Sequence, residues 1–444
     1  MRYPFIHSLS MLSGVLSTTN AVRPLSCDVA RALVPAASRR AFRPLLAAPL
    51  MLTIFSAVVP AIATAQTEPV GTASAAQTAS VSLASSFTLG SISVVTQGAP
   101  NLDFTFVSGG TCTVGTAYTA GQTCTVKYTF KPKAPGLRMG AITLYDNTTP
   151  TPVLQATVFV SGTGTGPLVD FYHNAQSTVA SGLGYSVAAA VDASGDLYVA
   201  DPESNQILKE TPFGGGYTQT VVANTTNNGI YNPEGLAVDG AGNVYIANFG
   251  YGNVLKETPS GGSYTQSVVA NATNGISNPP GVAVDGSGNV YIVDYYNNQI
   301  LKETLTSSGY TQTVIANAAN NGLNGPWVVA LDGAGNIYIA DGDNGSNPRV
   351  LKETLTAGNY VQSVVVGNLI ALGLAIDAGG SVYIAYSATD SVLKETPSSN
   401  GYTATTVPTS GLGYPEALAV DASGNLYVGG PGNSAVFKED FADP

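Results

Sequence analysis

Six near-copies of one phrase fill the chain from about residue 188 onward, and their number constrains the fold more than any other feature. Each copy reads as a strand, a tight turn and a second strand, with one aspartate just before the turn. These aspartates follow one another at intervals of 47, 46, 47, 45 and 44 residues, and they are Asp192, Asp239, Asp285, Asp332, Asp377 and Asp421. A period of about 40–50 residues with several short strands per copy is typical of a β-propeller. The sequence therefore predicts an all-β fold with one blade per copy.

The second copy illustrates the predicted blade. GLAVD is an inner strand, GAG a turn, NVYIA a second strand and VLKET a third, and a Gly-x-Tyr-Thr-Gln segment marks a fourth, outer strand. Asp239 is expected to accept hydrogen bonds from turn amides, and Gly242 to adopt a positive φ. The repeated aspartate is therefore interpreted as structural rather than catalytic. The Lys-Glu pair that recurs once per blade, as at Lys256 and Glu257, is interpreted as a solvated feature of the strand edge.

The sixth copy stops after its third strand, so its outer strand has to come from elsewhere in the chain. The segment 177–192, STVASGLGYSVAAAVD, matches 405–421, TTVPTSGLGYPEALAVD, which leads into the sixth copy. We therefore expect an outer strand near 176–181 to pair into the last blade, which closes the ring and removes exposed strand edges. This arrangement predicts a six-bladed β-propeller over residues 170–444.

The best copies, Pro233–Asn248 and Pro280–Asp294, follow the pattern P-x-G-[LV]-A-V-D-x-x-G-N-V-Y-I-A-D, with N-x-[IV] after it. In these residues the chain resembles the NHL-repeat propeller family over about 170–444. The resemblance implies the fold and leaves the function open. Members of that family bind proteins or RNA, act as extracellular sensor domains or, rarely, catalyse lyase reactions.

Charge is placed unevenly along the chain. Six of the 17 basic residues and one of the 28 acidic residues precede residue 66, so the remainder carries 11 basic and 27 acidic residues. A surface with this excess of negative charge repels phosphate backbones, and no basic face is evident. We therefore expect no nucleic-acid partner.

The N-terminal segment has the layout of an export signal. Arginines precede an apolar stretch, LLAAPLMLTIFSAVVPAIATA, which ends in the small residues Ala63-Thr64-Ala65. Residues 1–65 are therefore expected to be a signal cleaved after Ala65, which leaves no membrane span in the mature chain. A retained transmembrane helix is the alternative. The run Ser38-Arg39-Arg40-Ala41-Phe42-Arg43 resembles a twin-arginine motif, so export by either route stays open. The predicted location is secreted, periplasmic or at the cell surface of a bacterium.

A second domain is expected before the propeller. Residues 66–82 are rich in Ala, Thr and Ser and read as a linker. Residues 83–165 alternate apolar and polar residues in short runs, as in a small β-sandwich. The run AGQTCTVKYTFKPKAPGLRMGAITLYDN and the closing VSGTGTGP resemble the immunoglobulin-like domains of the abnormal-spindle/hydin type. Domains of that type are spacers and interaction modules, so the resemblance implies no chemistry.

Two cysteines remain once the signal is removed. Cys112 and Cys124 stand 12 residues apart in the predicted sandwich. An even pair in an exported chain is expected to form a disulfide, and two free thiols are the alternative.

Sequence variation between the copies points to one face of the propeller. The loops after the second strand differ between blades, whereas the opposite turns are nearly identical, so recognition is expected on the loop face. Aromatic residues at these loops are candidate ligand contacts: Phe249, Tyr251, Tyr295 and Tyr296. The alternative interpretation is ordinary polar loop composition.

The residues five positions before each aspartate are expected to ring the mouth of the central channel on that face. They are Val187, Glu234, Pro280, Trp327, Leu372 and Glu416, and Trp327 is the single tryptophan of the chain. A tryptophan that shares a channel entrance with two carboxylates, Glu234 and Glu416, is a candidate ligand site. Packing of an apolar plug is the alternative.

Metal and enzyme chemistry receive weaker support. Asp341, Asp343 and Asn344 open a longer loop whose oxygens could hold Ca²⁺, although no glutamate stands at its twelfth position. Otherwise no cofactor is expected. A histidine-ligated zinc or a Ser-His-Asp triad is excluded because only His173 remains after the signal, outside the blades.

We therefore predict a non-enzymatic exported protein, expected to be a monomer, that binds a protein or carbohydrate at the cell surface. The alternatives are a metal-dependent lactonase- or lyase-like propeller enzyme and an envelope sensor or scaffold.

Overall fold

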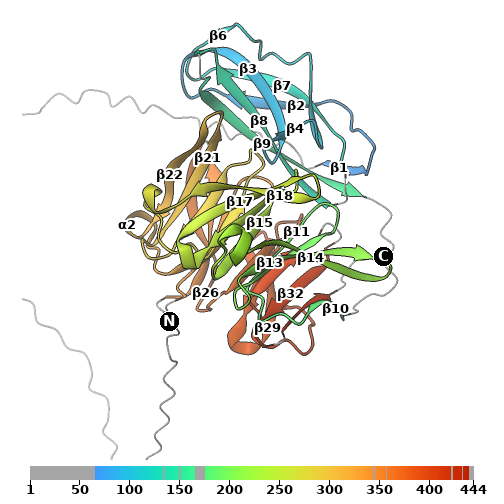
Figure 1. The fold of residues 1–444 in the computed structure, drawn as a ribbon. Coiled ribbons are helices and arrows are strands. Elements are labelled where there is room, and N and C mark those ends of the chain that lie inside the picture. The colour runs from blue at the N-terminus through green and yellow to red at the C-terminus, as the bar shows by residue number, and fades with distance from the viewer. Residues whose placement is uncertain are drawn as a thin grey trace, which may run out of the picture. The chain divides into compact units, whose positions relative to one another are not determined.

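The computed structural model describes residues 66–133, 136–149, 152–165, 176–343, 345, 347–356, 358–421, 424–432 and 434–439. The predicted export signal, residues 1–65, and His173 lie outside the described residues. The strands of the described residues form an N-terminal two-sheet domain and a C-terminal β-propeller (Figure 1).

The N-terminal domain consists of two sheets with one apolar core. One sheet has the order β1-β9-β8-β3-β4, with β6 paired to β3, and the other has the order β2-β7-β5. Phe104, Tyr128 and Phe130 are the largest side chains between them, and the rings of Phe104 and Phe130 stack 4.9 Å apart. The strands are β1 Gln66–Pro69, β2 Gln77–Ser82, β3 Phe87–Thr96, β4 Ala99–Pro100, β5 Phe104–Val107, β6 Ala117–Tyr118, β7 Thr123–Phe130, β8 Gly136–Asp146 and β9 Leu154–Thr165.

The expectation of a linker over residues 66–82 is wrong. β1 pairs with β9 in parallel, and β2 pairs with β7, with Val81 opposite Cys124. Ala79 and Val81 are both buried in the core. The segment's low-complexity composition hides a strict alternation of side chains in QTASVS, and this alternation places one face of β2 against the core.

The predicted disulfide is confirmed. Cys112 and Cys124 are bonded, their Cα atoms lie 5.0 Å apart, and both side chains are buried in the core of the N-terminal domain. The bridge joins β7 to the loop before β6.

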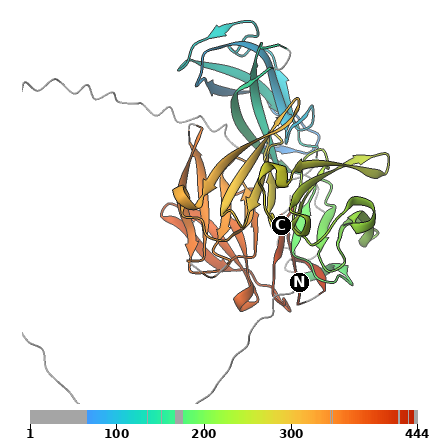
Figure 2. The same cartoon turned by 60° about the vertical axis from the view of Figure 1, so that its left-hand side comes forward.

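The propeller consists of four-stranded antiparallel sheets, and the described residues form six of them. Figure 2 shows these sheets following one another in chain order, from green through yellow and orange to red. Their strands, from the innermost outward, are β11 Ala188–Val191, β12 Leu197–Asp201, β13 Gln206–Phe213 and β14 Gly216–Asn224; β15 Pro233–Val238, β16 Val244–Asn248, β17 Asn253–Ser260 and β18 Ser263–Ala270; β19 Val282–Val284, β20 Val290–Asp294, β21 Gln299–Thr306 and β22 Gly309–Asn317; β23 Pro326–Leu331, β24 Ile337–Asp341, β25 Arg349–Thr356 and β26 Asn359–Gly367; β27 Gly373–Ile376, β28 Val382–Tyr386, β29 Ser391–Ser398 and β30 Gly401–Thr406; and β31 Ala417–Val420, β32 Leu426–Gly430, β33 Ala435–Glu439 and β10 Gln176–Ser181.

The last sheet is completed from the N-terminal side of the propeller. β10 runs antiparallel to β33, with Gln176 opposite Glu439 and Ser181 opposite Ala435. Val179 and Ala180 of β10 are buried in the same cluster as residues of the first and last sheets. The inner strand β11 packs against both β15 and β31, so the first sheet also contacts the last. The sheets therefore form a closed ring.

The short helices of the described residues lie in the connections between strands. Three follow outer strands: α1 Thr225–Asn228, η2 Ala272–Asn274 and α2 Ala318–Asn321. Each begins after an asparagine whose side chain accepts a hydrogen bond from a backbone amide of the helix, and each ends at a glycine with positive φ. Two lie between second and third strands: η1 Phe249–Tyr251 and η3 Ser387–Thr389. Among the described residues, none of these helices is long and apolar enough to cross a membrane.

The repeated aspartate has the structural role expected from the sequence. In the second sheet, Asp239 Oδ1 accepts hydrogen bonds from the amides of Ala241 (2.9 Å) and Asn243 (3.0 Å), and Gly242 has a φ of 80°. The Tyr245 hydroxyl donates to Asp239 Oδ2 at 3.1 Å. The carboxylate therefore holds the turn and the second strand together and is not available for chemistry.

A tyrosine near the start of the outer strand lies at the junction between neighbouring sheets in every sheet except the last. The hydroxyls of Tyr291 and Tyr360, in adjacent sheets, lie 3.2 Å apart. Tyr427 of the last sheet hydrogen-bonds in the same way to Tyr217 of the first. The outer strand of the last sheet, β10, carries no tyrosine, and the Tyr383 hydroxyl of the fifth sheet accepts instead from the Lys394 ammonium of its own sheet, at 2.7 Å. The Gly-x-Tyr pattern of the outer strands thus encodes contacts between blades.

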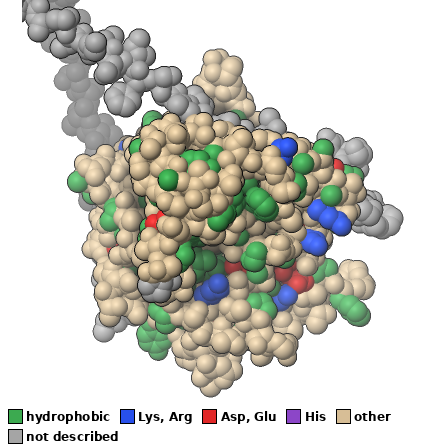
Figure 3. Space-filling model, turned by 90° about the horizontal axis from the view of Figure 1, so that it is seen from above, with side chains coloured by type: hydrophobic (Ala, Val, Ile, Leu, Met, Phe, Trp, Pro, Cys, Tyr) green, Lys and Arg blue, Asp and Glu red, His purple; other side chains and the backbone are tan. Residues whose placement is uncertain are grey.

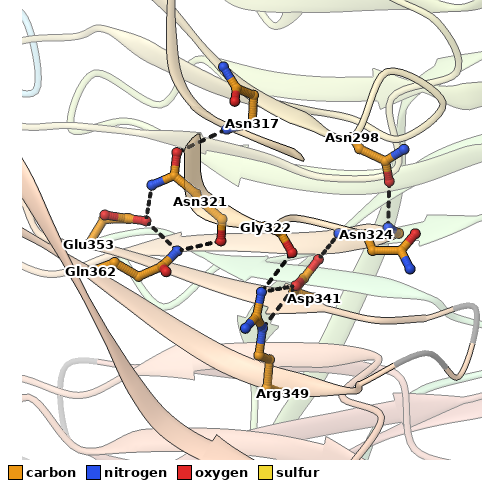
Figure 4. A network of polar contacts seen from close by, with 10 residues as sticks. Asn298, Asn317, Asn321, Gly322, Asn324, Asp341, Arg349, Glu353 and Gln362 are labelled. Carbon is orange, nitrogen blue, oxygen red and sulfur yellow. Dashed lines mark hydrogen bonds and ion pairs between the residues drawn. The ribbon is translucent and has the colours of Figure 1, made fainter. Parts of the chain in front are cut away.

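The Lys-Glu pairs are not the solvated pairs expected from the sequence. Their glutamates are all at most 4% exposed: Glu210, Glu257, Glu303, Glu353, Glu395 and Glu439. Glu353 Oε1 accepts hydrogen bonds from the side-chain amides of Asn321 and Gln362, both at 3.0 Å (Figure 4). Asn321 precedes the fourth sheet and Gln362 belongs to its outer strand, so Glu353 connects two blades. A strand pattern alone does not show which side chains face a neighbouring blade.

The second oxygen of Glu353, Oε2, is buried without a hydrogen-bond partner. Burial raises the pKa of Glu353, and the two amide hydrogen bonds lower it by less. The stability contributed by this group is therefore fully present below its unfolded pKa of about 4.3 and is lost as the pH rises through the higher folded pKa.

We expect Glu353→Gln to raise the free energy of unfolding by about 1 kcal/mol at pH 8, since Gln keeps the accepting oxygen and removes the buried charge. At pH 4 the gain should vanish, because the wild-type carboxyl is then neutral as well. Urea unfolding at both pH values measures the difference. The exposed Glu203→Gln is the matched control, and an equal effect of Glu353→Gln at both pH values would contradict the interpretation.

Candidate functional site

The candidate site lies at one end of the inner strands, where each connection from an outer strand enters the next blade. The six residues expected to ring the channel mouth do line one cavity: Val187, Glu234, Pro280, Trp327, Leu372 and Glu416. Glu234 and Trp327 are the second residues of β15 and β23, and Glu416 immediately precedes β31. The cavity continues along the inner strands past Gly235, Gly281 and Gly373.

Three of the predicted aromatic residues gather around Trp327. The Phe249 ring lies 6.0 Å from the Trp327 ring, and the Tyr295 ring lies 5.3 Å from it at 90°. Tyr296 stands edge-on to Tyr295 at 5.1 Å and is 60% exposed. These contacts join the loops of the second and third blades to the inner strand of the fourth.

Tyr251, also predicted as a ligand contact, does not belong to this group. It follows Phe249 by two residues in η1, and its ring packs against Tyr231 at 5.4 Å. Both rings are exposed, and neither lines the cavity. The loop face therefore carries two separate aromatic groups.

The two carboxylates of the cavity differ in their surroundings. Glu234 Oε1 accepts a hydrogen bond of 2.7 Å from the Asn232 side chain. Burial, with a smaller contribution from the nearby Glu416, raises the pKa of Glu234 to about 8, and the hydrogen bond from Asn232 partly offsets this rise. Burial, with a contribution from Asp343, raises the pKa of Glu416 to about 7. Among the described residues, no hydrogen-bond donor or cation contacts the Glu416 carboxylate.

Tyr185 also lies beside the two carboxylates, although the sequence analysis did not single it out. Its pKa is raised to about 12 by burial and by the charges of Glu234, Glu416, Glu203 and Asp201. Tyr185 and Asn232 each stand two residues before a residue of the channel ring. Alignment of the connections between repeats could have identified this position.

The loops around the cavity are held by hydrogen bonds between blades. Asn205, Asn298 and Asp390 each have a φ near 50° and accept a hydrogen bond from the next blade's connection. The donors are the amides of Asn232 (2.7 Å), Gly325 (2.6 Å) and Tyr414 (2.8 Å), and Figure 4 shows the contact of Asn298. Asparagine and aspartate adopt this backbone conformation more readily than other residues with a side chain. The loop face is thus preorganised.

The predicted calcium loop is a different structure from the one expected. Asp341 Oδ2 forms an ion pair with Arg349 at 3.0 Å, and Asp341 Oδ1 accepts from the Asn324 amide at 2.7 Å (Figure 4). Its carboxylate therefore closes a connection between blades. Asp343 lies 3.5 Å from the Tyr295 hydroxyl, and Asn344 lies outside the described residues. Within the described parts of the chain, no three His, Cys, Asp or Glu side chains are placed to hold a metal ion.

Comparison with known proteins finds no matching family model and no matching curated protein. A gluconolactonase from Xanthomonas campestris has a similar structure over 59% of this chain and 88% of its own, with 15% identity and a TM-score of 0.48. A protein of unknown function from Bacteroides thetaiotaomicron covers 79% of this chain and 90% of its own, at 15% identity and a TM-score of 0.47. An auxiliary nutrient-binding protein from Bacteroides ovatus covers 78% and 90%, at 13% identity and 0.45. At this level of similarity none of them assigns an activity to the chain.

Proposed function

We propose that the chain is an exported, non-enzymatic binding protein whose loop face binds a protein or carbohydrate partner at the cell surface. In this proposal a six-bladed NHL-type propeller presents the site, an immunoglobulin-like sandwich precedes it as a spacer, and the mature protein is a monomer. The observation that carries the proposal is one cavity lined by Trp327 and by the carboxylates of Glu234 and Glu416, with the rings of Phe249 and Tyr295 packed against the tryptophan.

The rigidity of the site supports binding. Loops held by hydrogen bonds between blades lose little conformational entropy when a partner binds, and large aromatic rings supply contact area at low entropic cost. Figure 3 shows one face of the molecule, on which uncharged side chains dominate and the few basic side chains are scattered. Together with the acidic composition, this supports a partner other than a nucleic acid.

A lactonase- or lyase-like enzyme is the second candidate. The observation that favours it is the pair of cavity carboxylates with raised pKa values, since such groups can transfer protons near neutral pH. The involvement of Asp341 in an ion pair removes one of the oxygen ligands that a metal-dependent mechanism could have used.

The proposed function is tested with residues 66–444 on a glycan array and in pull-downs from cell-envelope extracts, with and without Ca²⁺. We expect the variant Trp327→Ala, Tyr295→Ala, Tyr296→Ala to bind its partner at least thirtyfold more weakly, because central aromatic residues dominate binding energy. The matched control removes the other aromatic pair of the same face, Tyr231→Ala, Tyr251→Ala. Binding that survives the triple change, or that the control abolishes equally, would refute this assignment.

A further inference from the structure

The cavity has an acidic side and an aromatic side. The inner strands follow one another around the channel, and β11 contacts both β15 and β31. Glu234 on β15 and Glu416 beside β31 therefore stand on either side of the first blade, with Tyr185 between them. The strand β23, which carries Trp327, contacts β19 and β27 and so lies across the channel. A ligand in the mouth would meet carboxylates at one end and aromatic rings at the other.

In the part of the chain that the structure describes, no basic side chain forms an ion pair with Glu234 or Glu416. The charges that act on Glu234, Glu416 and Tyr185 come from Asp201, Glu203, Asp343 and from the two glutamates themselves, and all are negative. Arg349, the first residue of β25, already forms an ion pair with Asp341. Glu234 and Glu416 are partly buried, and carboxylates that are partly removed from water without a cation either bind protons or attract a positive charge.

We propose that this mouth recognises a protonated organic amine, bound at Glu234 and Glu416, whose carbon skeleton packs against Trp327. The inference rests on the proposed function and names the chemical group that its partner presents. An ammonium group satisfies both carboxylates through charge-assisted hydrogen bonds, and the adjacent rings attract a cation through their faces.

A bare divalent cation fits this site less well. Calcium takes six to eight oxygen ligands and magnesium requires an octahedral set, whereas the side chains that line the cavity are two carboxylates, Trp327 and aliphatic groups. Two kinds of partner carry a suitable amine: a carbohydrate with unacetylated amino groups, or a protein with an exposed lysine. The experiment below separates them.

The proposal includes a pH dependence. An ammonium ion binds the ionised carboxylates, and burial raises the pKa of Glu234 to about 8 and of Glu416 to about 7. Affinity for a lysine ammonium, which stays protonated over this range, should therefore increase as the pH rises from 6 to 8, by about tenfold if one ionisation controls binding. An amino sugar loses its own proton in the same range, so the pH dependence is read from the lysine series. The other titratable groups near Glu234 and Glu416 are Asp343, Asp201, Glu203 and Tyr185. None of them carries a positive charge that would reverse the increase of affinity with pH.

Trp327, as the only tryptophan of the chain, reports binding directly through its fluorescence. Residues 66–444 are titrated at pH 6 and pH 8 with a glucosamine tetramer and with its fully N-acetylated form. A pentapeptide with a central lysine, blocked at its N-terminus, and its ε-acetyl-lysine counterpart form the second series. Acetylation removes the charge and keeps the skeleton.

We expect one amine series to change the Trp327 fluorescence, acetylation to weaken binding at least tenfold, and Glu416→Gln to weaken it by a similar factor. Glu68→Gln, in the N-terminal domain, should leave the affinity unchanged. The series that binds identifies the partner as carbohydrate or protein.

Equal binding of acetylated and free-amine forms, or no fluorescence change with any probe, would overturn the amine inference. The proposed binding function would still stand if the triple aromatic variant lost its array or extract partner, so the two failures are distinguishable.

Discussion

Deletion of residues 176–181 will open the propeller and lower its unfolding midpoint by roughly 10 °C or more. The deletion removes the strand that pairs with β33 and takes Val179 and Ala180 out of the apolar cluster between the first and last sheets. Lost burial of these side chains and lost ladder hydrogen bonds together amount to roughly 5 kcal/mol. For a domain of this size, each kcal/mol corresponds to about 2–4 °C. The exposed edge of β33 should also promote association.

A rescue variant makes this prediction specific. In the first sheet the third and outer strands are joined through Gly214 and Gly215 alone, so the sequence of 176–181 can be appended after Pro444 through a Gly-Gly link in the deleted chain. Restored pairing should recover most of the lost thermal stability, measured as the unfolding midpoint from the fluorescence of Trp327 during heating. It should also restore a single species in size-exclusion chromatography. A deletion that leaves the midpoint unchanged, or an appended strand that does not recover it, would show that the ring does not depend on this closure.

The repeated blades and their turns could be predicted from the sequence because they depend on residues that are close together in the chain. The turn aspartate needs only its own amides and a glycine with positive φ, and the position of Trp327 and Glu416 follows from counting along an inner strand to that turn. The six sheets and the common cavity agree with this counting. Side-chain direction within a loop is harder to infer. Phe249 contacts Trp327, while Tyr251, two residues later in the same turn, packs against Tyr231.

The features that the sequence analysis missed depend on contacts between distant segments. Glu353 of one Lys-Glu pair, for example, is held by Gln362 of its own outer strand and by Asn321 of the connection from the preceding blade. Asp341 resembles a metal ligand by its spacing, but Arg349, eight residues later on the next strand, neutralises it. Likewise, β2 reads as a low-complexity linker until β7 is placed beside it. In each case the residue type and its local spacing are compatible with two different environments. The residue that contacts it from elsewhere in the chain determines which environment forms.

A buried ion pair in the N-terminal domain also depends on a contact between distant segments. Its removal should cause the second-largest loss of stability. Asp103 is fully buried, and its Oδ2 accepts from Arg138 Nε at 2.8 Å and pairs with Arg138 Nη2 at 2.8 Å. Its Oδ1 accepts from the Lys133 amide at 2.7 Å, which ties the start of β5 to the approach to β8. Asp103→Ala leaves Arg138 buried without a counter-ion, and we expect the N-terminal domain to lose about 3–5 kcal/mol.

The double variant Asp103→Leu, Arg138→Met separates two causes of instability: an arginine left buried without its counter-ion, and the loss of the ion pair itself. Because it removes both charges and fills their space, it should recover more than half of the loss caused by Asp103→Ala. The Cys112–Cys124 bridge supplies the measurement, since both cysteines are buried and a reductant reaches them when the surrounding core opens. Thiol labelling after a reductant pulse, at increasing urea concentration, gives the midpoint for this domain, while Trp327 fluorescence reports the propeller in the same samples. A double variant as unstable as the single one would mean that the hydrogen bonds of Asp103 to the backbone, rather than the ion pair, stabilise this end of the domain.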